Sequence, residues 1–160
     1  MARSDAASLA ATGSLRQRLV TLALEWERTF GVAPSITSTI AELDAALLVG
    51  HTEQTYAKSC LTSGRTAVAR GCDFVFSEIR YQVKANRPSG NPGSVVTLVA
   101  NANNYDWDRL IWILYDKSYA LLEAWEWERD HYRHKFDLKK RLSPQDMRDG
   151  HRLWPKENPG

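Results

Sequence analysis

The sequence predicts one domain of mixed α and β structure, either α/β or α+β, in which helices cover a sheet of about five strands. Apolar residues recur at helical spacing in the first third of the chain, and short apolar runs of strand length follow. A helical pattern then resumes near the end. The chain has 160 residues, of which 43% are hydrophobic and 25% charged, which is typical of a single folded domain.

The first expected helix occupies residues 14–31. Ser14 suits its N-cap, and Gly31 suits its end. We expect its core-facing side to be the apolar stripe that recurs every three or four residues, Leu15, Leu19, Leu22, Trp26 and Phe30. Residues 1–13 are rich in Ala and Ser and lack such a pattern. We therefore expect a disordered N-terminus before a single domain of residues 14–160.

A second helix is expected in residues 33–50. Pro34 and Ser35 suit its start, and Gly50 suits its end. Its apolar stripe would be Ile36, Ile40, Leu43 and Leu47. Residues 51–63 are unassigned, with a helix as one possibility, and residues 66–71 could form a short strand.

The middle of the chain has a β pattern. Strands are expected at residues 73–76, 80–85, 94–100, 109–116 and 119–127, with loops at 86–93 and 101–108. The first two would form a hairpin that turns near Ser77 and Glu78. Because no Gly occupies the turn, we expect a loop longer than two residues. A helix is expected at 127–136, and a short capped helix begins at Pro144.

A few polar residues on the hairpin form the candidate functional site. Gln82 and Lys84 would share one face of the second limb, opposite to Tyr81 and Val83, because alternate residues of a strand point to opposite faces. Antiparallel pairing with the first limb can bring Asp73 beside Gln82 and Lys84.

Two interpretations of this pattern remain open from spacing alone. A sheet with one face in water commonly carries a polar stripe such as Arg80, Gln82 and Lys84. The functional alternative is a metal site, because carboxylate and amide oxygens are hard ligands that suit Mg²⁺. An ammonium beside them can orient an attacking water and neutralise charge in a phosphoryl transition state.

One pattern on the two limbs of the hairpin resembles the signature of the PD-(D/E)XK nucleases, the restriction-endonuclease-like superfamily. It is Asp73 followed on the next strand by Gln82-Val83-Lys84. The usual signature is an Asp on one strand and Glu-x-Lys on the next, and the Gln-x-Lys pattern is similar to a variant of Mrr-like and related branches. The family often carries a Glu on the preceding helix, where Glu42 stands. The resemblance covers residues 36–128 and implies a restriction-endonuclease-like mixed sheet flanked by helices.

The resemblance implies a Mg²⁺-dependent or Mn²⁺-dependent deoxyribonuclease, most simply an endonuclease, that hydrolyses phosphodiester bonds by metal-assisted attack of water. Asp73 would bind the metal directly, Gln82 would supply its side-chain oxygen, and Val83 its carbonyl. Lys84 would position the nucleophilic water. Glu42 would hold a metal-bound water or a second ion.

Some features of the sequence depart from the family pattern and weaken the assignment of its site roles to these residues. Cys72 stands where the family often has Pro, and Gln82 removes one negative charge, which weakens Mg²⁺ binding. Glu42 fits a solvent-facing helix acid equally well, and Asp44 or Glu53 could replace it. The alternative function is therefore a non-catalytic nucleic-acid-binding or assembly module with the same fold.

Positive charge is concentrated towards the C-terminus. Residues 129–156 contain nine Lys or Arg and four Asp, a net charge of +5, although the whole chain carries only +2. Such a segment can contact phosphates, or it can be a solvated helix face and tail. The expected nucleic-acid contacts are Arg80, Arg87, Lys139, Lys140 and Arg141. DNA is the expected partner, although the sequence does not distinguish it from RNA.

The sequence also predicts a cytoplasmic protein with no membrane partner. No stretch resembles a signal peptide, and no apolar run approaches the roughly 20 residues that a membrane helix needs. Cys60 and Cys72 lack the spacing of a metal or redox motif, so we expect reduced thiols. A homodimer and membership of a larger defence or repair complex both remain open.

Overall fold

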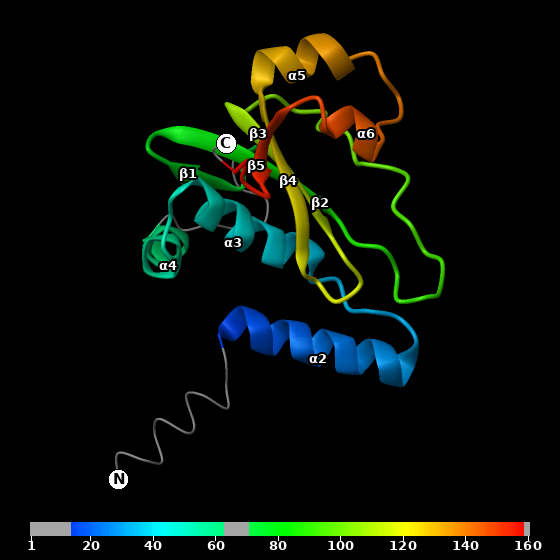
Figure 1. The fold of residues 1–160 in the computed structure, drawn as a ribbon. Helices are drawn as coiled ribbons and strands as arrows, with labels where there is room; N and C mark the ends of the chain where they lie inside the picture. Colours follow the sequence, from blue (N-terminus) through cyan, green and yellow to red (C-terminus); the bar gives the residue numbers. More distant parts are fainter. Residues whose placement is uncertain (1–13, 63–70, 159–160) are drawn as a thin grey trace.

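A computed structural model describes residues 14–62 and 71–158 (Figure 1). Five strands form one sheet in the spatial order β1-β2-β3-β4-β5. They are β1 (Phe74–Phe76), β2 (Ile79–Asn86), β3 (Arg109–Tyr115), β4 (Leu121–Glu128) and β5 (His151–Trp154). All neighbours are antiparallel except β2 and β3, which are parallel. The predicted α/β fold class, with a five-stranded mixed sheet flanked by helices, is confirmed.

The fifth strand is not the one that the sequence predicted. Residues 94–100, expected as a strand, contribute only an isolated bridge between Val99 and Leu142. Residues 151–154, not expected as a strand, pair with β4 instead. Because β2 and β3 pair directly with each other, the segment between them has no place in that part of the sheet. The strand considered at residues 66–71 falls almost wholly outside the described residues.

The β1–β2 turn is a two-residue turn, so the expected longer loop was wrong. Phe76 pairs with Ile79, which leaves only Ser77 and Glu78 between the strands. Both have positive φ, 50° and 66°, as a primed hairpin turn requires. Neither residue is Gly, so this backbone has a conformational cost. The pairing of the strands and the stacked rings of Phe74 and Tyr81, with centroids 4.9 Å apart, can offset that cost.

Helix α2 (Leu15–Phe30) has the expected bounds but buries an unexpected side. Ser14 accepts a hydrogen bond from the backbone N–H of Gln17, and Gly31 ends the helix with φ of 85°. The buried residues are Val20 and Ala23, whereas most of the predicted stripe is exposed (Leu15 77%, Leu22 63%, Trp26 53%, Phe30 64%). Arg16 and Glu27 lie on the same side of α2 as Val20 and Ala23. Their ion pairs, described below, fix which side of the helix faces the core.

Helix α3 (Thr37–Val49) packs on the sheet through small residues. Its buried side chains are Ile40, Ala41, Ala45 and Ala46, and Leu47 is exposed despite the predicted stripe. Alanines allow the helix backbone to approach the strands closely. The helix begins at Thr37, later than the expected start near Pro34.

The remaining helices are short. Helix α4 (Glu53–Thr62) lies in the segment that the sequence left open, of which residue 63 is outside the described residues. Helix α5 (Arg129–Phe136) follows β4 directly, and α6 (Pro144–Met147) starts with a Ser143 capping box, both near the expected positions. In the described part of the chain, every helix is too short or too polar to cross a membrane.

Two apolar clusters occupy opposite faces of the sheet. Tyr81, Val83, Ile111 and Ile113 pack with α3 and with Val20 and Ala23 of α2. The other face carries Leu110, Trp112 and Trp127, which pack with Tyr132 and Phe136 of α5 and with the segment around Trp107. The alternation along β3 follows from the two-residue period of a strand. Both faces of β3 are therefore buried, which makes it the central strand of the core.

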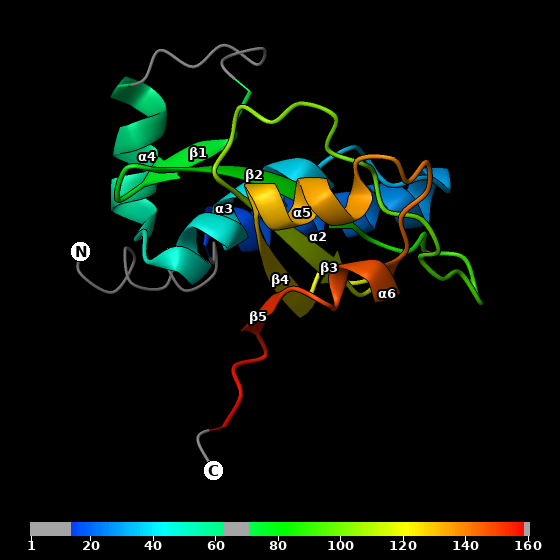
Figure 2. The same cartoon turned by 90° about the horizontal axis from the view of Figure 1, so that it is seen from above.

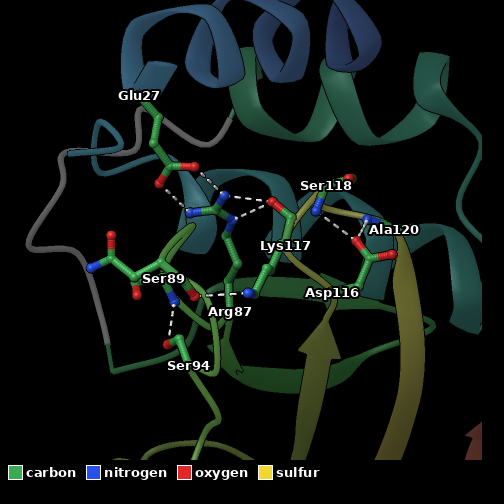
Figure 3. Close-up of polar contacts among 9 residues, drawn as sticks. Glu27, Arg87, Ser89, Ser94, Asp116, Lys117, Ser118 and Ala120 are labelled. Atoms are coloured by element: carbon green, nitrogen blue, oxygen red, sulfur yellow. Dashed lines mark hydrogen bonds and ion pairs between the residues drawn. The ribbon is translucent and has the colours of Figure 1, made fainter. Parts of the chain in front are cut away.

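Two polar clusters attach α2 to the rest of the domain. The Arg16 guanidinium donates to both carboxylate oxygens of Asp44 (2.7 and 2.8 Å), and Asp44 also accepts from the Tyr115 hydroxyl. Near the other end of α2, Arg87 donates to both carboxylate oxygens of Glu27 (3.0 and 2.8 Å) and to the Lys117 carbonyl (Figure 3). Helix α2 is thus held at both ends by charged pairs.

The Tyr115 hydroxyl should contribute measurably to stability. Burial raises the pKa of Tyr115, so the hydroxyl stays protonated and donates to Asp44. We expect Tyr115→Phe to lower the free energy of unfolding by about 1.5–3 kcal/mol, because the lost bond is to a charged group. Tyr119→Phe is the matched control, since the buried Tyr119 hydroxyl has no hydrogen-bond partner among the described residues. Urea unfolding should show no loss for Tyr119→Phe, and equal losses in both variants would contradict this account.

Candidate active site on strand β2

Asp73 lies beside the Gln82-Val83-Lys84 segment. Its backbone N–H donates to the Tyr81 carbonyl (2.7 Å), and its carboxylate Oδ2 accepts from the Val83 N–H (2.7 Å). Strand β1 pairs with β2 only as far as Tyr81. The next backbone donor on that edge of β2 is the Val83 N–H, and the Asp73 side chain accepts from it. The predicted meeting of Asp73 with the second limb of the hairpin is therefore present in the structure.

Gln82 and Lys84 lie on the opposite face from Tyr81 and Val83. Tyr81 and Val83 are buried in the cluster under α3, whereas Gln82 and Lys84 are half-buried. In the parallel register, Gln82 is opposite Leu110 and Lys84 opposite Trp112. The two polar side chains thus lie on the face of the sheet that also carries Trp112, not on a fully solvated face.

The Lys84 ammonium makes no hydrogen bond or ion pair with any residue that the structure describes. Most other half-buried cations of the described chain have such partners, including Arg16 and Arg87. A half-buried ammonium without a protein carboxylate is suited to an external anion. Lys84 is therefore the residue of the segment whose position favours binding a phosphate.

Glu42 lies on α3, which covers the other face of the sheet. Helix α3 covers the face of Tyr81 and Val83, opposite to that of Gln82 and Lys84. Glu42 instead lines an apolar cavity of about 440 Å³ between α2, α3 and α4. The small residues of α3 turn toward the sheet, and Glu42 turns toward the other helices. The role of Glu42 in holding a second ion stays a prediction.

The two acids that could replace Glu42 are also placed elsewhere. Asp44 is held by Arg16 and Tyr115, and Glu53 lines the same cavity as Glu42. Within residues 14–62 and 71–158, no three His, Cys, Asp or Glu side chains gather as a metal site. Any ion at the candidate site would have Asp73 as its carboxylate ligand.

The remaining oxygen donors fit a weakly held Mg²⁺. Asp73 offers a carboxylate, and Gln82 is the adjacent residue that carries an amide oxygen. The N–H and C=O of one strand residue point to the same edge, so the Val83 carbonyl also faces the side of Asp73. Mg²⁺ commonly keeps several waters and takes only one or two protein carboxylates. Oxygen donors of these kinds suit such an ion, but the set carries little negative charge.

Arg80 and Arg87, expected to contact nucleic acid, have different surroundings. Arg80 is 45% exposed and donates to both carboxylate oxygens of Asp108 (3.2 and 3.1 Å), which lowers the pKa of Asp108. The side chain of Arg87 is only 5% exposed, and its guanidinium lies 4.2 Å from the Tyr119 ring centroid while it binds Glu27. Arg87 is thus a structural residue, because contact with a phosphate would require breaking this network.

The basic C-terminal segment is partly neutralised by its own acids. Lys135 pairs with Asp149 (2.7 Å) and Lys139 with Asp146 (2.8 Å). Lys140 and Arg141 are exposed and form no ion pair with any described residue. Of the three expected contacts in this segment, Lys140 and Arg141 are the two that remain accessible to a polyanion.

Sequence reasoning missed Asn86 and Trp112. The Trp112 indole donates to the Asn86 side-chain oxygen (2.9 Å), and the Asn86 amide donates to the Leu98 carbonyl (3.1 Å). Asn86 continues the two-residue period of Gln82 and Lys84, so its face could have been predicted. Trp112 could not, because its position opposite Lys84 depends on the parallel register of β2 and β3.

Substitutions of Asp73 should separate its structural role from any role of its charge. Asp73→Asn keeps an oxygen that can accept from the Val83 N–H, so we expect little change in the free energy of unfolding. Asp73→Ala removes the acceptor and should cost about 1–3 kcal/mol. Urea unfolding without divalent ions measures both. Equal destabilisation by the two variants would show that the charge, rather than the hydrogen bond, supports the fold.

No protein-family model and no curated protein matches this sequence. The functional assignment therefore rests on the positions of Asp73, Gln82 and Lys84 and on the resemblance of their pattern to the PD-(D/E)XK signature.

Proposed function

We propose that this chain is a Mg²⁺-dependent nuclease that hydrolyses phosphodiester bonds in DNA. The observation that supports the proposal is the hydrogen bond between the Asp73 carboxylate and the N–H of Val83, the residue between Gln82 and Lys84. A carboxylate, an amide and an ammonium that no described residue pairs with then belong to one short stretch of the hairpin. The resemblance to the PD-(D/E)XK signature supports the same assignment.

Asp73, Gln82 and the Val83 carbonyl would hold the ion. When bound, Mg²⁺ supplies Lewis acidity, lowering the pKa of a bound water and polarising a phosphoryl oxygen. Lys84 would donate hydrogen bonds to the attacking water and to the phosphoryl oxygens, where negative charge grows in the transition state. Its ammonium is suited to this role because no described carboxylate already neutralises it. Lys140 and Arg141 would bind the phosphate backbone away from the reacting bond.

A non-catalytic nucleic-acid-binding module is the second candidate, and a specific observation favours it. Glu42 lines the cavity between α2, α3 and α4, and Gln82 stands where the family signature has an acid, so ion binding would depend chiefly on the Asp73 carboxylate. A titration with Mn²⁺ distinguishes the two candidates. An enzyme should show a rise in melting temperature that Asp73→Asn removes, by mass action on the folded state. A binding module should bind DNA with no such rise.

Lys84→Ala tests the catalytic assignment. We expect a fall of about 100-fold or more in cleavage rate, the usual effect of removing a group that stabilises transition-state charge. The assay follows supercoiled plasmid, linear DNA and RNA with Mg²⁺, Mn²⁺ or EDTA, and EDTA should abolish cleavage. Lys58→Ala is the matched control, because Lys58 is exposed on α4, whose Tyr56 packs on the apolar cluster of the other face.

The folding of the Lys84 variant must be checked by its melting temperature and its response to Mn²⁺, both of which should match the wild type. Cleavage at the wild-type rate would show that Gln82 and Lys84 are an ordinary polar stripe and would remove the basis of the proposal.

The contribution of the basic segment to DNA binding has a separate test. Lys140→Ala combined with Arg141→Ala should weaken binding similarly across DNA sequences and reduce the slope of log affinity against log salt by up to about 1.8. Lys139→Ala should add less, since Lys139 is already paired with Asp146. Fluorescence anisotropy at several salt concentrations provides the slope. A slope equal to that of wild type would mean that the segment is only solvated.

A further inference from the structure

Helix α2 carries several large apolar side chains that the described chain leaves mostly exposed. Leu15, Leu22, Trp26 and Phe30 are each more than half exposed, and the rings of Trp26 and Phe30 contact each other with centroids 4.5 Å apart. Figure 1 shows α2 at the periphery of the fold, with one side toward α3 and the other facing outward. Large apolar side chains gathered in this way mark an interaction site more often than a solvated surface.

The spacing of the exposed residues fits a helix partner. Leu15, Leu19, Leu22 and Trp26 follow one another at intervals of four, three and four residues, the pattern of a two-helix seam. Leu19, the half-buried member, also contacts the core cluster beneath α2. The seam is thus continuous with the packed interior, and its surface is held rigidly because Arg16 and Glu27 fix the helix at both ends.

Charges beside the seam identify a second copy of α2 as the partner. Arg18 and Glu25 flank it, both are exposed, and neither forms an ion pair with a described residue. In an antiparallel pair that places Leu15 opposite Trp26 of the second copy, Arg18 faces Glu25 of the second copy. The two-fold axis repeats this contact, so the surface is complementary to itself.

A parallel arrangement lacks this complementarity. Across a parallel seam, Arg18 would face Ala23 of the second copy, and Glu25 would face Phe30 of the second copy. Neither contact joins opposite charges. The charge pattern of α2 therefore favours the antiparallel pair specifically.

We propose that this chain forms a two-fold symmetric homodimer in which α2 packs antiparallel against α2 of a second copy, through Leu15, Leu19, Leu22 and Trp26 and with two Arg18–Glu25 pairs between copies. The inference is independent of the nuclease assignment, because α2 contributes no residue to the candidate site on β2.

Sedimentation velocity of the full chain across a range of concentrations tests the proposal. We expect a dimer whose dissociation constant rises at least tenfold in Leu22→Glu, while the melting temperature of the isolated monomer does not fall, because Leu22 is exposed there. Leu138→Glu is the matched control, because Leu138 is 95% exposed elsewhere on the surface.

A charge exchange tests the geometry. Arg18→Glu and Glu25→Arg should each weaken the dimer. The variant with both changes should recover wild-type association, since each contact between copies again joins opposite charges. A chain that is monomeric at every concentration, or a dimer unaffected by Leu22→Glu, would overturn the proposal. Failure of the double variant to recover would overturn the antiparallel arrangement.

Discussion

The parallel pairing of β2 with β3 is the constraint on which the rest of the structure depends. Parallel neighbours cannot be joined by a short turn, so residues 87–108 must return the chain from one end of the sheet to the other (Figures 1 and 2). That connection reaches the Val99–Leu142 bridge and brings Trp107 onto the second face of the sheet. It also leaves β3 buried on both faces, with α3 on one side and α5 on the other. Residues 94–100, which have the composition of a strand, therefore lie outside the sheet, and Val99 packs in the cluster on its second face.

The same constraint shapes the candidate site. Pairing with β3 occupies one edge of β2 over most of its length, whereas β1 covers only the start of the other edge. Asp73 accepts from the Val83 N–H at the point where β1 ends, so its carboxylate is a structural acceptor and, under the proposed function, also an ion ligand. This dual role explains why a metal-free stability measurement on Asp73 variants is informative only when the hydrogen bond and the charge are separated. Gln82 and Lys84 lie on the same face because they are two residues apart on β2.

The orientation of helix α2 on the core follows its charged pairs and not its apolar periodicity. Its inner side carries two small apolar residues between Arg16 and Glu27, which are fixed by Asp44 and Arg87. The side with the larger apolar residues is left outward. Charged groups that are partly buried must keep their partners, because an uncompensated charge costs more than an exposed leucine. The apolar surface left on α2 then becomes available to a second copy of the chain.

The sequence alone determined the fold class, the caps of α2 and α6, the hairpin containing Ser77 and Glu78, and the common face of Gln82 and Lys84. These follow from local rules, namely cap chemistry and the periods of helix and strand. Tertiary structure decided the rotation of α2, the position of Glu42, the burial of Arg87, and the replacement of residues 94–100 by β5 in the sheet. Each depends on partners distant in the sequence. Apolar spacing can show that a helix has two unlike sides, but only the ion pairs formed by Arg16 and Glu27 determine which side faces the core.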